Sequence, residues 1–316
     1  MGAAARIALA ALVFVGLAFV VDLRELLRLA ASAAPVWLVA SVLAFTVDQA
    51  LSTFKWRLLL EGLGLRLPFL PLYKTTTKAF FVSFFVPSAL TADVYKGVAL
   101  ARTHGSAKSV TSSIVLERLL GIASIVTVGV MALGSLPARM WGVDSATTLG
   151  VGGVALVLGL ALFLQADRVW ARVAPLLPSP LQRVAPHVTD LAAAFSAYRS
   201  QRALLAVSFF LSVAIQFSRC TATWMVARAL NDPTPFWAFL FLVPCLYMVN
   251  MLPFATSRLG LEQGAFVVLF GAVGMPAEVA LTVSLLSVLT SLVVALPGGV
   301  WLVTDRRAPV REEVYR

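Results

Sequence analysis

Long apolar runs alternate with short polar stretches along the chain. A helix that crosses a bilayer needs about 20 mostly apolar residues. Runs that approach or exceed this length fall at 7–21, 36–54, 111–134, 148–165, 203–227 and 278–303. Because helices satisfy their own backbone groups in lipid, the pattern predicts an all-α integral membrane protein with about six spanning helices.

Two further apolar stretches are interrupted by proline. One begins at Ala79 and is stopped by Pro87, within an expected hairpin over 79–90. The other runs over 236–252, stops at Pro253 and resumes over 264–274. Proline frees backbone groups that must then find partners in protein or in cavity water. We therefore expect two re-entrant helical hairpins, with Pro87, Pro253 and Gly260 as structural hinges.

The composition agrees with a membrane protein. Of 316 residues, 60% are hydrophobic and 13% are charged, which excludes an ordinary soluble domain. The formal charge of +10 indicates loops held against anionic lipid, and nucleic acid is not an expected partner. If one hairpin enters from the cytoplasm and the other from outside, most of the 25 basic residues lie on the cytoplasmic side with both termini.

The two halves of the chain share their spacing. The helices starting near residues 36 and 203, the two prolines, and the helices starting near 111 and 278 are each about 167 residues apart, which predicts two inverted repeats. The alternative is coincidence, because the match lies in spacing and hydropathy alone. The expected organisation is one membrane domain over 1–316: a first transmembrane helix (7–21), the first repeat (36–134), a connecting helix with a cytoplasmic interfacial segment (148–202), the inverted second repeat (203–303) and a basic cytoplasmic tail (304–316).

Ionisable residues lie inside several of the apolar runs. Asp48 and Arg219 fall within predicted spanning helices, and Glu117 and Arg118 fall near the start of another. Such groups face a polar pathway or a partner within the bundle, because exposure to lipid is costly. Whether Asp48 and Arg219 pair with each other or line the path stays open.

The densest polar cluster follows Pro87. Asp93 and Lys96 are three residues apart and share a helix face. A helix that starts here would direct backbone N–H groups at an anion, with Lys96 adding charge. Arg118 offers a fork of donors that suits a phosphate or Asp93. Alternatively, Asp93 only stabilises the helix start and Lys96 extends to the membrane interface.

The matching place in the second half carries Arg258 and Glu262, spaced i, i+4. They either stabilise each other, or Arg258 binds a headgroup while Glu262 couples protons. The segment Lys55-Trp56-Arg57 is interpreted as an anchor at the membrane interface. The predicted substrate-binding residues are Asp93, Tyr95, Lys96, Glu117, Arg118, Arg258 and Glu262.

The sequence carries no motif for hydrolytic or redox chemistry. His104 and His187 are far apart, and Cys220 and Cys245 lie in apolar runs. We therefore expect no metal, no cofactor, no catalytic residue and no enzymatic activity.

Several short motifs, in this order, resemble the transmembrane domain of lysylphosphatidylglycerol synthase, a flippase-like family. They are Lys55-Trp56-Arg57-Leu58-Leu59-Leu60, Phe85-Val86-Pro87, Asp93-Val94-Tyr95-Lys96, Glu117-Arg118-Leu119-Leu120-Gly121, Leu252-Pro253 with Gly260 and Gly264, and Leu296-Pro297-Gly298-Gly299. The segment 257–263 departs from the family pattern, which is consistent with a different headgroup. The soluble aminoacyl-transfer domain of the two-domain synthases is not found here, so lipid lysinylation is not expected.

The resemblance implies a bacterial or archaeal cytoplasmic (inner) membrane protein that moves lipids between leaflets. We expect a translocase for an anionic phospholipid or a lipid-linked intermediate. The alternative is a non-transporting partner that presents a lipid-linked substrate to a separate glycosyl- or aminoacyl-transferase. A third hypothesis, transfer chemistry in the membrane site itself, lacks a nucleophile or a metal cluster.

Overall fold

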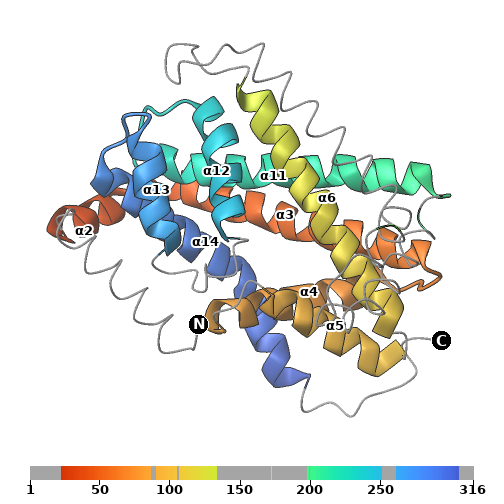
Figure 1. The fold of residues 1–316 in the computed structure, drawn as a ribbon. Coiled ribbons are helices and arrows are strands. Elements are labelled where there is room, and N and C mark those ends of the chain that lie inside the picture. The colour runs from red at the N-terminus through yellow and green to blue at the C-terminus, as the bar shows by residue number, and fades with distance from the viewer. Residues whose placement is uncertain are drawn as a thin grey trace, which may run out of the picture.

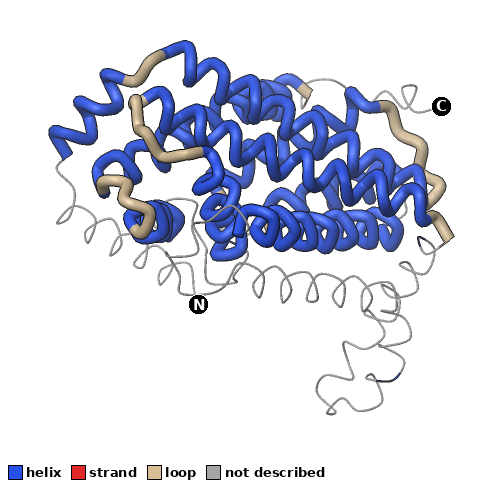
Figure 2. Tube along the Cα trace, turned by 90° about the horizontal axis from the view of Figure 1, so that it is seen from above, coloured by secondary structure: helices blue, strands red, loops and turns tan. Residues whose placement is uncertain are grey.

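The computed structural model describes residues 23–86, 90–104, 107–133, 172, 198, 200–250 and 261–305. Every regular element in these ranges is an α-helix (Figure 1). The helices are α2 (Leu23–Ser32), α3 (Pro35–Gly62), α4 (Phe69–Phe85), α5 (Thr91–His104), α6 (Ala107–Leu133), α11 (Arg202–Ala229), α12 (Phe236–Asn250), α13 (Leu261–Gly271) and α14 (Ala277–Thr304). Seen from above, they form a bundle in which short loops join some neighbouring helices (Figure 2).

Four of these helices are long and apolar enough to cross a membrane: α3, α6, α11 and α14. Each has 27 or 28 residues, so each is about 42 Å long. They coincide with four predicted spans, which the helices extend by several residues at some ends. The expected spans at 7–21 and 148–165, most of the connecting segment 148–202, and most of the tail 304–316 lie outside the described residues.

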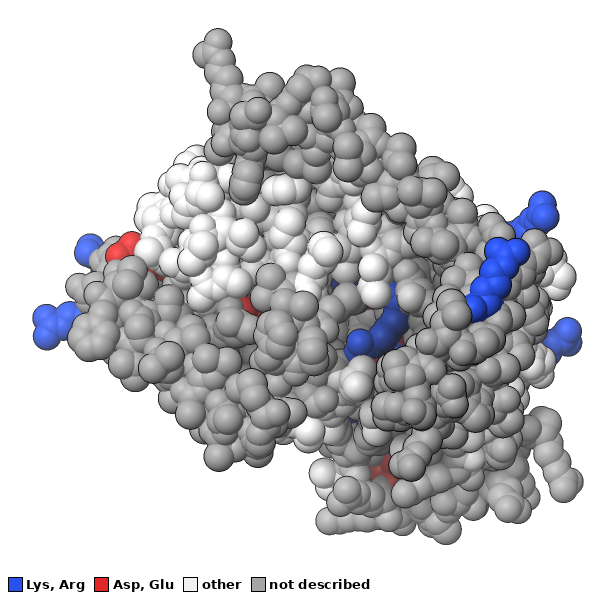
Figure 3. Space-filling model, viewed as in Figure 1, with Lys and Arg blue, Asp and Glu red and all other residues white. Residues whose placement is uncertain are grey.

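The surface of the long helices supports a lipid environment. Leu289, Val293, Leu296, Val300 and Val303 are about half exposed and recur every three or four residues along α14. This spacing places them on one helix face. On the face shown in Figure 3, most of the described surface is uncharged, and basic groups project mainly at its two ends.

Helices α3 and α11 lie antiparallel in the centre of the bundle. At one end the Ala34 N–H donates to the Ala229 carbonyl oxygen over 2.8 Å. At the other, Gln201 Nε2 donates to the Gly62 carbonyl oxygen over 2.8 Å, and Tyr198 Oη donates to that of Leu59 over 2.7 Å. Burial raises the pKa of Tyr198, so this hydroxyl stays a donor at neutral pH. The polypeptide entering the second half is thereby fixed to the end of α3.

Two pairs of short helices pack at opposite ends of the antiparallel α3–α11 pair. Trp56 and Leu60, near the C-terminus of α3, form a core with residues of α4, α5 and α6. Val226 and Ala227, near the C-terminus of α11, form another with residues of α12, α13 and α14. Because α3 and α11 run in opposite directions, the α4–α5 and α12–α13 pairs lie at opposite ends.

Helix α4 is longer than the sequence predicts. The hairpin was expected over 79–90, but α4 begins at Phe69. Thr75 Oγ1 donates to the Pro71 carbonyl oxygen, and Thr77 Oγ1 to that of Tyr73, each four residues earlier. The hydroxyls therefore find partners inside the helix, which explains how a polar sequence continues it. The hinge residues Pro87, Pro253 and Gly260 lie outside the described residues.

Helix α4 also contacts α14 at very short range. A Cβ atom on Gly298 would lie 2.3 Å from the Thr77 carbonyl oxygen, so glycine is needed for this approach. Farther along the same contact, Lys78 pairs with Asp305, and the Tyr73 and Trp301 rings meet edge to face. The first short pair is therefore attached to the last spanning helix.

Candidate functional site

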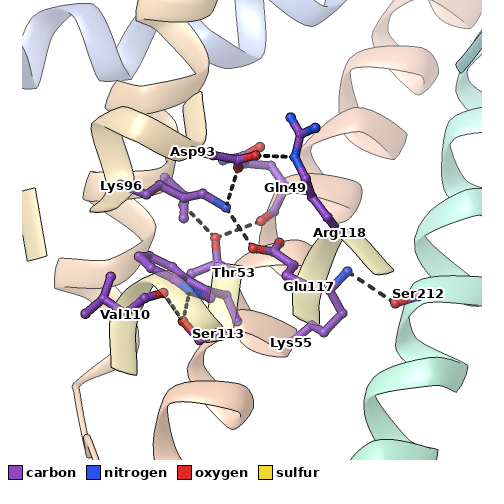
Figure 4. A network of polar contacts seen from close by, with 12 residues as sticks. Gln49, Thr53, Lys55, Asp93, Lys96, Val110, Ser113, Glu117, Arg118 and Ser212 are labelled. Atoms are coloured by element: carbon purple, nitrogen blue, oxygen red, sulfur yellow. Dashed lines mark hydrogen bonds and ion pairs between the residues drawn. The ribbon is translucent and has the colours of Figure 1, made fainter. Parts of the chain in front are cut away.

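Four charged side chains from α5 and α6 form a continuous set of ion pairs, which we call the charge network (Figure 4). Lys96 Nζ lies 2.7 Å from Glu117 Oε2 and 3.4 Å from Asp93 Oδ1. Arg118 Nε donates to the other oxygen, Asp93 Oδ2. The order Glu117–Lys96–Asp93–Arg118 alternates negative and positive charge, so each group has an oppositely charged neighbour.

Burial decreases along the charge network. The Lys96 and Glu117 side chains are 10% and 12% exposed, whereas Asp93 is 19% and Arg118 is 33% exposed. Buried ions are tolerated when they are paired and hydrogen-bonded. Arg118 is therefore the member closest to the surface, and its terminal nitrogens point away from the other three side chains in Figure 4.

Trp56 of α3 forms the base of the charge network. The Lys96 ammonium lies 4.9 Å from the centroid of the Trp56 ring, within the range of a cation–π interaction. The ring is fully buried. Its Nε1–H donates to Ser113 Oγ over 3.0 Å, and Ser113 donates to the Val110 carbonyl oxygen over 2.7 Å. The indole is thus fixed against α6 and holds Lys96 in place.

Helix α3 adds further polar side chains next to the network. The Thr53 and Thr76 hydroxyls are 2.7 Å apart, which links α3 to α4. Lys55 is only 4% exposed and donates to Ser212 Oγ of α11 over 3.2 Å. Within the described ranges Lys55 forms no ion pair. Its ammonium lies on the same side of the network as Glu117 (Figure 4).

A separate ion pair joins α3 and α11. Arg219 Nε donates to Asp48 Oδ1 over 2.8 Å, and the guanidinium lies 5.0 Å from the centroid of the Tyr247 ring on α12. The question that the sequence left open is thereby answered: Asp48 and Arg219 pair with each other.

The sequence from residue 4 to residue 299 matches the family model described as the lysylphosphatidylglycerol synthase TM region. The chain belongs to this family. No curated protein matches the chain. Family membership and four helices of spanning length identify a multi-pass membrane protein.

In this member of the lysylphosphatidylglycerol synthase TM family, the structure brings together four of the seven predicted substrate-binding residues: Asp93, Lys96, Glu117 and Arg118. Tyr95 instead lines a neighbouring groove between α4 and α5. Glu262 lies in the first turn of α13 and is partly buried. Arg258 lies outside the described residues, so its expected interaction with Glu262 stays a prediction.

The groove between α4 and α5 is mainly apolar. It has a volume of about 540 Å³ and is lined by Val82, Val86, Thr91, Val94, Tyr95, Val98 and Ala99. Val94 and Val98 are 58% and 45% exposed. Asp93 and Lys96 belong to the same helix but face the charge network. Helix α5 therefore presents a charged face to the bundle and an apolar face to the groove.

The interpretation of Lys55-Trp56-Arg57 as an interface anchor was wrong for two of its three residues. Lys55 and Trp56 are buried, because α3 continues to Gly62 and carries them back into the bundle. Arg57 is the member near the surface, where it pairs with Glu61. The overlooked signal is spacing: Lys55 follows Asp48 by seven residues, which places both on one face of a helix.

Across the described residues, no three His, Cys, Asp or Glu side chains gather as a metal site would require. The ion pairs of the charge network offer electrostatic chemistry: the Lys96 and Arg118 cations can bind an anion, and the Asp93 and Glu117 carboxylates can pair with them again when the anion leaves.

Proposed function

We propose that this protein moves an anionic phospholipid, or a lipid-linked intermediate with an anionic headgroup, between the two leaflets of the membrane. The observation that carries the proposal is the charge network of Asp93, Lys96, Glu117 and Arg118, buried among helices of spanning length. Such groups at membrane depth are costly and usually mark a substrate pathway. Membership of the lysylphosphatidylglycerol synthase TM family supports a lipid as the substrate.

We further propose that the two halves are inverted repeats. Helices α3 and α11 are antiparallel, and each short pair packs against the C-terminal part of its own long helix. Contacts between the halves correspond, because α4 packs on α14 as α12 packs on α6. Contacts within the halves correspond as well, because α3 contacts α6 as α11 contacts α14. Inverted halves with interrupted helices are typical of transporters that bind substrate near the bilayer midplane.

The headgroup phosphate would enter the charge network at its most exposed end. Arg118 offers planar donors to a phosphate, and its terminal nitrogens are directed away from the network (Figure 4). In this hypothesis Lys96, Arg118 and Arg258 hold the phosphate, whereas Asp93 and Glu262 orient the bases. The apolar groove beside α5 suits an acyl chain of the same lipid.

The proposed setting is the cytoplasmic membrane of a bacterium or archaeon, with both termini in the cytoplasm and no enzymatic step. In this orientation α4 enters from the cytoplasmic side. The pairing of Lys78, midway along α4, with Asp305 supports this arrangement, since it places α4 beside the C-terminal end of α14, which is cytoplasmic in the proposed orientation.

Lipid exchange in vesicles tests the proposal. The full chain is reconstituted into liposomes with a trace of fluorescently labelled phosphatidylglycerol, and dithionite is added outside. The protein should allow bleaching beyond the outer leaflet, and Arg118→Ala should slow the exchange about tenfold or more, because a charge-assisted contact is lost.

Arg57→Ala is the matched control, because Arg57 is similarly exposed and pairs with Glu61 outside the network. It should exchange lipid at nearly the wild-type rate. Bleaching equal to that of protein-free liposomes under every ion gradient would refute the translocase. Lipid binding without exchange would favour the non-transporting partner instead.

A further inference from the structure

Lys55 is a buried cation that has no carboxylate partner of its own among the described residues. It donates a hydrogen bond to a hydroxyl, Ser212 Oγ, over 3.2 Å, and 4% of the residue is exposed. Ser212 in turn donates to the Ser208 carbonyl oxygen over 2.9 Å. A neutral hydroxyl does not compensate a buried ammonium as a carboxylate does. The position of Lys55 therefore calls for a balancing charge elsewhere.

The charged side chains around Lys55 come from four helices. Glu117 of α6 attracts it most strongly, and Asp48 on its own helix attracts it more weakly. Arg219 of α11 and Lys96 of α5 repel it. Asp48 is already paired with Arg219 over 2.8 Å, so Glu117 is the carboxylate best placed to balance Lys55.

Glu117 is shared between two lysines. It accepts a hydrogen bond from Lys96 over 2.7 Å, and Lys55 also acts on it electrostatically. Counted with the charge network, Lys55 makes three cations (Lys55, Lys96 and Arg118) against two carboxylates (Asp93 and Glu117). These five described side chains thus carry one positive charge in excess, and a ligand with one negative charge would neutralise it.

We propose that Lys55 is the alternative partner of Glu117, and that the site selects headgroups with a single net negative charge. When a phosphate takes Lys96 and Arg118, the Glu117 carboxylate turns from Lys96 to Lys55. This inference rests on the proposed function and adds to it the charge of the substrate and a positioning residue that acts through Glu117.

The surroundings favour an exchange of partners by side-chain movement alone. Lys55 has a flexible four-carbon chain and lies on α3, which the Trp56–Ser113 hydrogen bond holds against α6. Lys96 meanwhile keeps its position over the Trp56 ring. Only the lysine–carboxylate contacts need to change while the helices stay in place.

Substrate preference in liposomes tests the role of Lys55. Exchange is measured separately with labelled phosphatidylglycerol, which is monoanionic, and labelled phosphatidylcholine, which is zwitterionic. Wild type should prefer the anionic lipid. Lys55→Gln should reduce this preference about tenfold, since one uncompensated charge is removed. Lys55→Arg, which keeps the charge, and Lys74→Gln, the same change at a lysine on α4 outside the network, should retain the preference.

The double variant Lys55→Gln/Glu117→Gln separates charge balance from a purely structural role. It leaves Lys96, Asp93 and Arg118, and so restores one excess positive charge. The preference for phosphatidylglycerol should return toward the wild-type value. An unchanged preference in Lys55→Gln, or a double variant no better than the single one, would overturn the proposal.

Binding in detergent gives a readout that does not depend on transport. Short-chain dihexanoyl phosphatidylglycerol should raise the melting temperature of the wild-type protein and of Lys55→Arg, but raise that of Lys55→Gln much less. Equal shifts in wild type and Lys55→Gln would refute the role of Lys55. If wild type binds this lipid selectively yet exchanges none, the translocase is refuted, and the comparison of shifts still decides the role of Lys55.

Discussion

Arg219 Nε lies 2.8 Å from Asp48 Oδ1. This contact joins two helices through residues that are 171 positions apart in sequence. Both side chains lie within the central antiparallel pair, α3 and α11. Together with the Lys55–Ser212 hydrogen bond and that from Ser218 Oγ to the Ala44 carbonyl oxygen, the contact forms a line of polar interactions along the interface between the two helices. The stability of the bundle should therefore depend on keeping each charge paired.

Removing one partner of this pair should destabilise the protein. Arg219→Gln leaves the Asp48 carboxylate buried, which should lower the free energy of unfolding by about 3 kcal/mol. The double variant Asp48→Asn/Arg219→Gln should recover much of the loss, because both charges of the pair are then removed. Thermal unfolding of the purified protein measures both. Arg228→Gln, at the end of the same helix, is the control, and a loss equal to that of Arg219→Gln would contradict the prediction.

Trp56 should stabilise the protein by more than the burial of its apolar ring. Trp56→Phe removes the hydrogen bond to Ser113 and weakens the contact with Lys96, so we expect a loss of about 1–2 kcal/mol. Trp301→Phe is the matched control, because Trp301 also lies near a lysine, at 5.7 Å from Lys74. The melting temperatures of the two variants are compared. A larger fall for Trp301→Phe would contradict the stabilising role of the Trp56 hydrogen bond and its contact with Lys96.

Gly298 should tolerate no added side chain. Gly298→Ala places a Cβ atom against the Thr77 carbonyl oxygen, and separating the backbones of α14 and α4 should cost about 1–3 kcal/mol. Gly121→Ala is the control, because a Cβ atom there meets nothing within 4 Å. The melting temperature should fall for the first variant and stay near the wild-type value for the second. Similar melting temperatures would mean that the α4–α14 contact is looser than described.

The antiparallel arrangement of α3 and α11 predicts that the loops following these two helices lie on opposite sides of the membrane. Arg66, after α3, and Pro233, after α11, are both exposed and follow helices that run in opposite directions. Arg66→Cys and Pro233→Cys, introduced singly with Cys220 and Cys245 replaced by alanine, should react with an impermeant maleimide from opposite sides. Labelling of both from one side of sealed vesicles would rule out the arrangement.

Local sequence patterns predicted the presence of the spanning helices better than the residues at which helices begin and end. The apolar runs located α3, α6, α11 and α14, and the three-residue spacing predicted that Asp93 and Lys96 share a face, which the 3.4 Å contact confirms. The first half of α4 was missed, because its polar residues lie outside the apolar run that begins at Ala79. Its threonine hydroxyls bond to carbonyl oxygens one turn earlier, and composition alone does not reveal that.

Contacts between distant helices could not be predicted from local patterns. The pairing of Arg118 with Asp93 was one of two alternatives, and that of Asp48 with Arg219 was left open, because both depend on how helices pack. Lys55 and Trp56 were misplaced for a related reason. A basic and an aromatic residue near the end of an apolar run are typical of a membrane interface, and only the full length of α3 shows that they lie inside the bundle.

At Gly298, α14 meets the backbone of α4 with no side chain between them, and Lys78 and Asp305 clasp the same two helices farther along. Because no side chains separate the two backbones at this contact, the helices cannot slide past each other by changing rotamers. The first short pair and α14 should therefore move as one rigid unit, so that a tilt of either helix is accompanied by a similar displacement of the other.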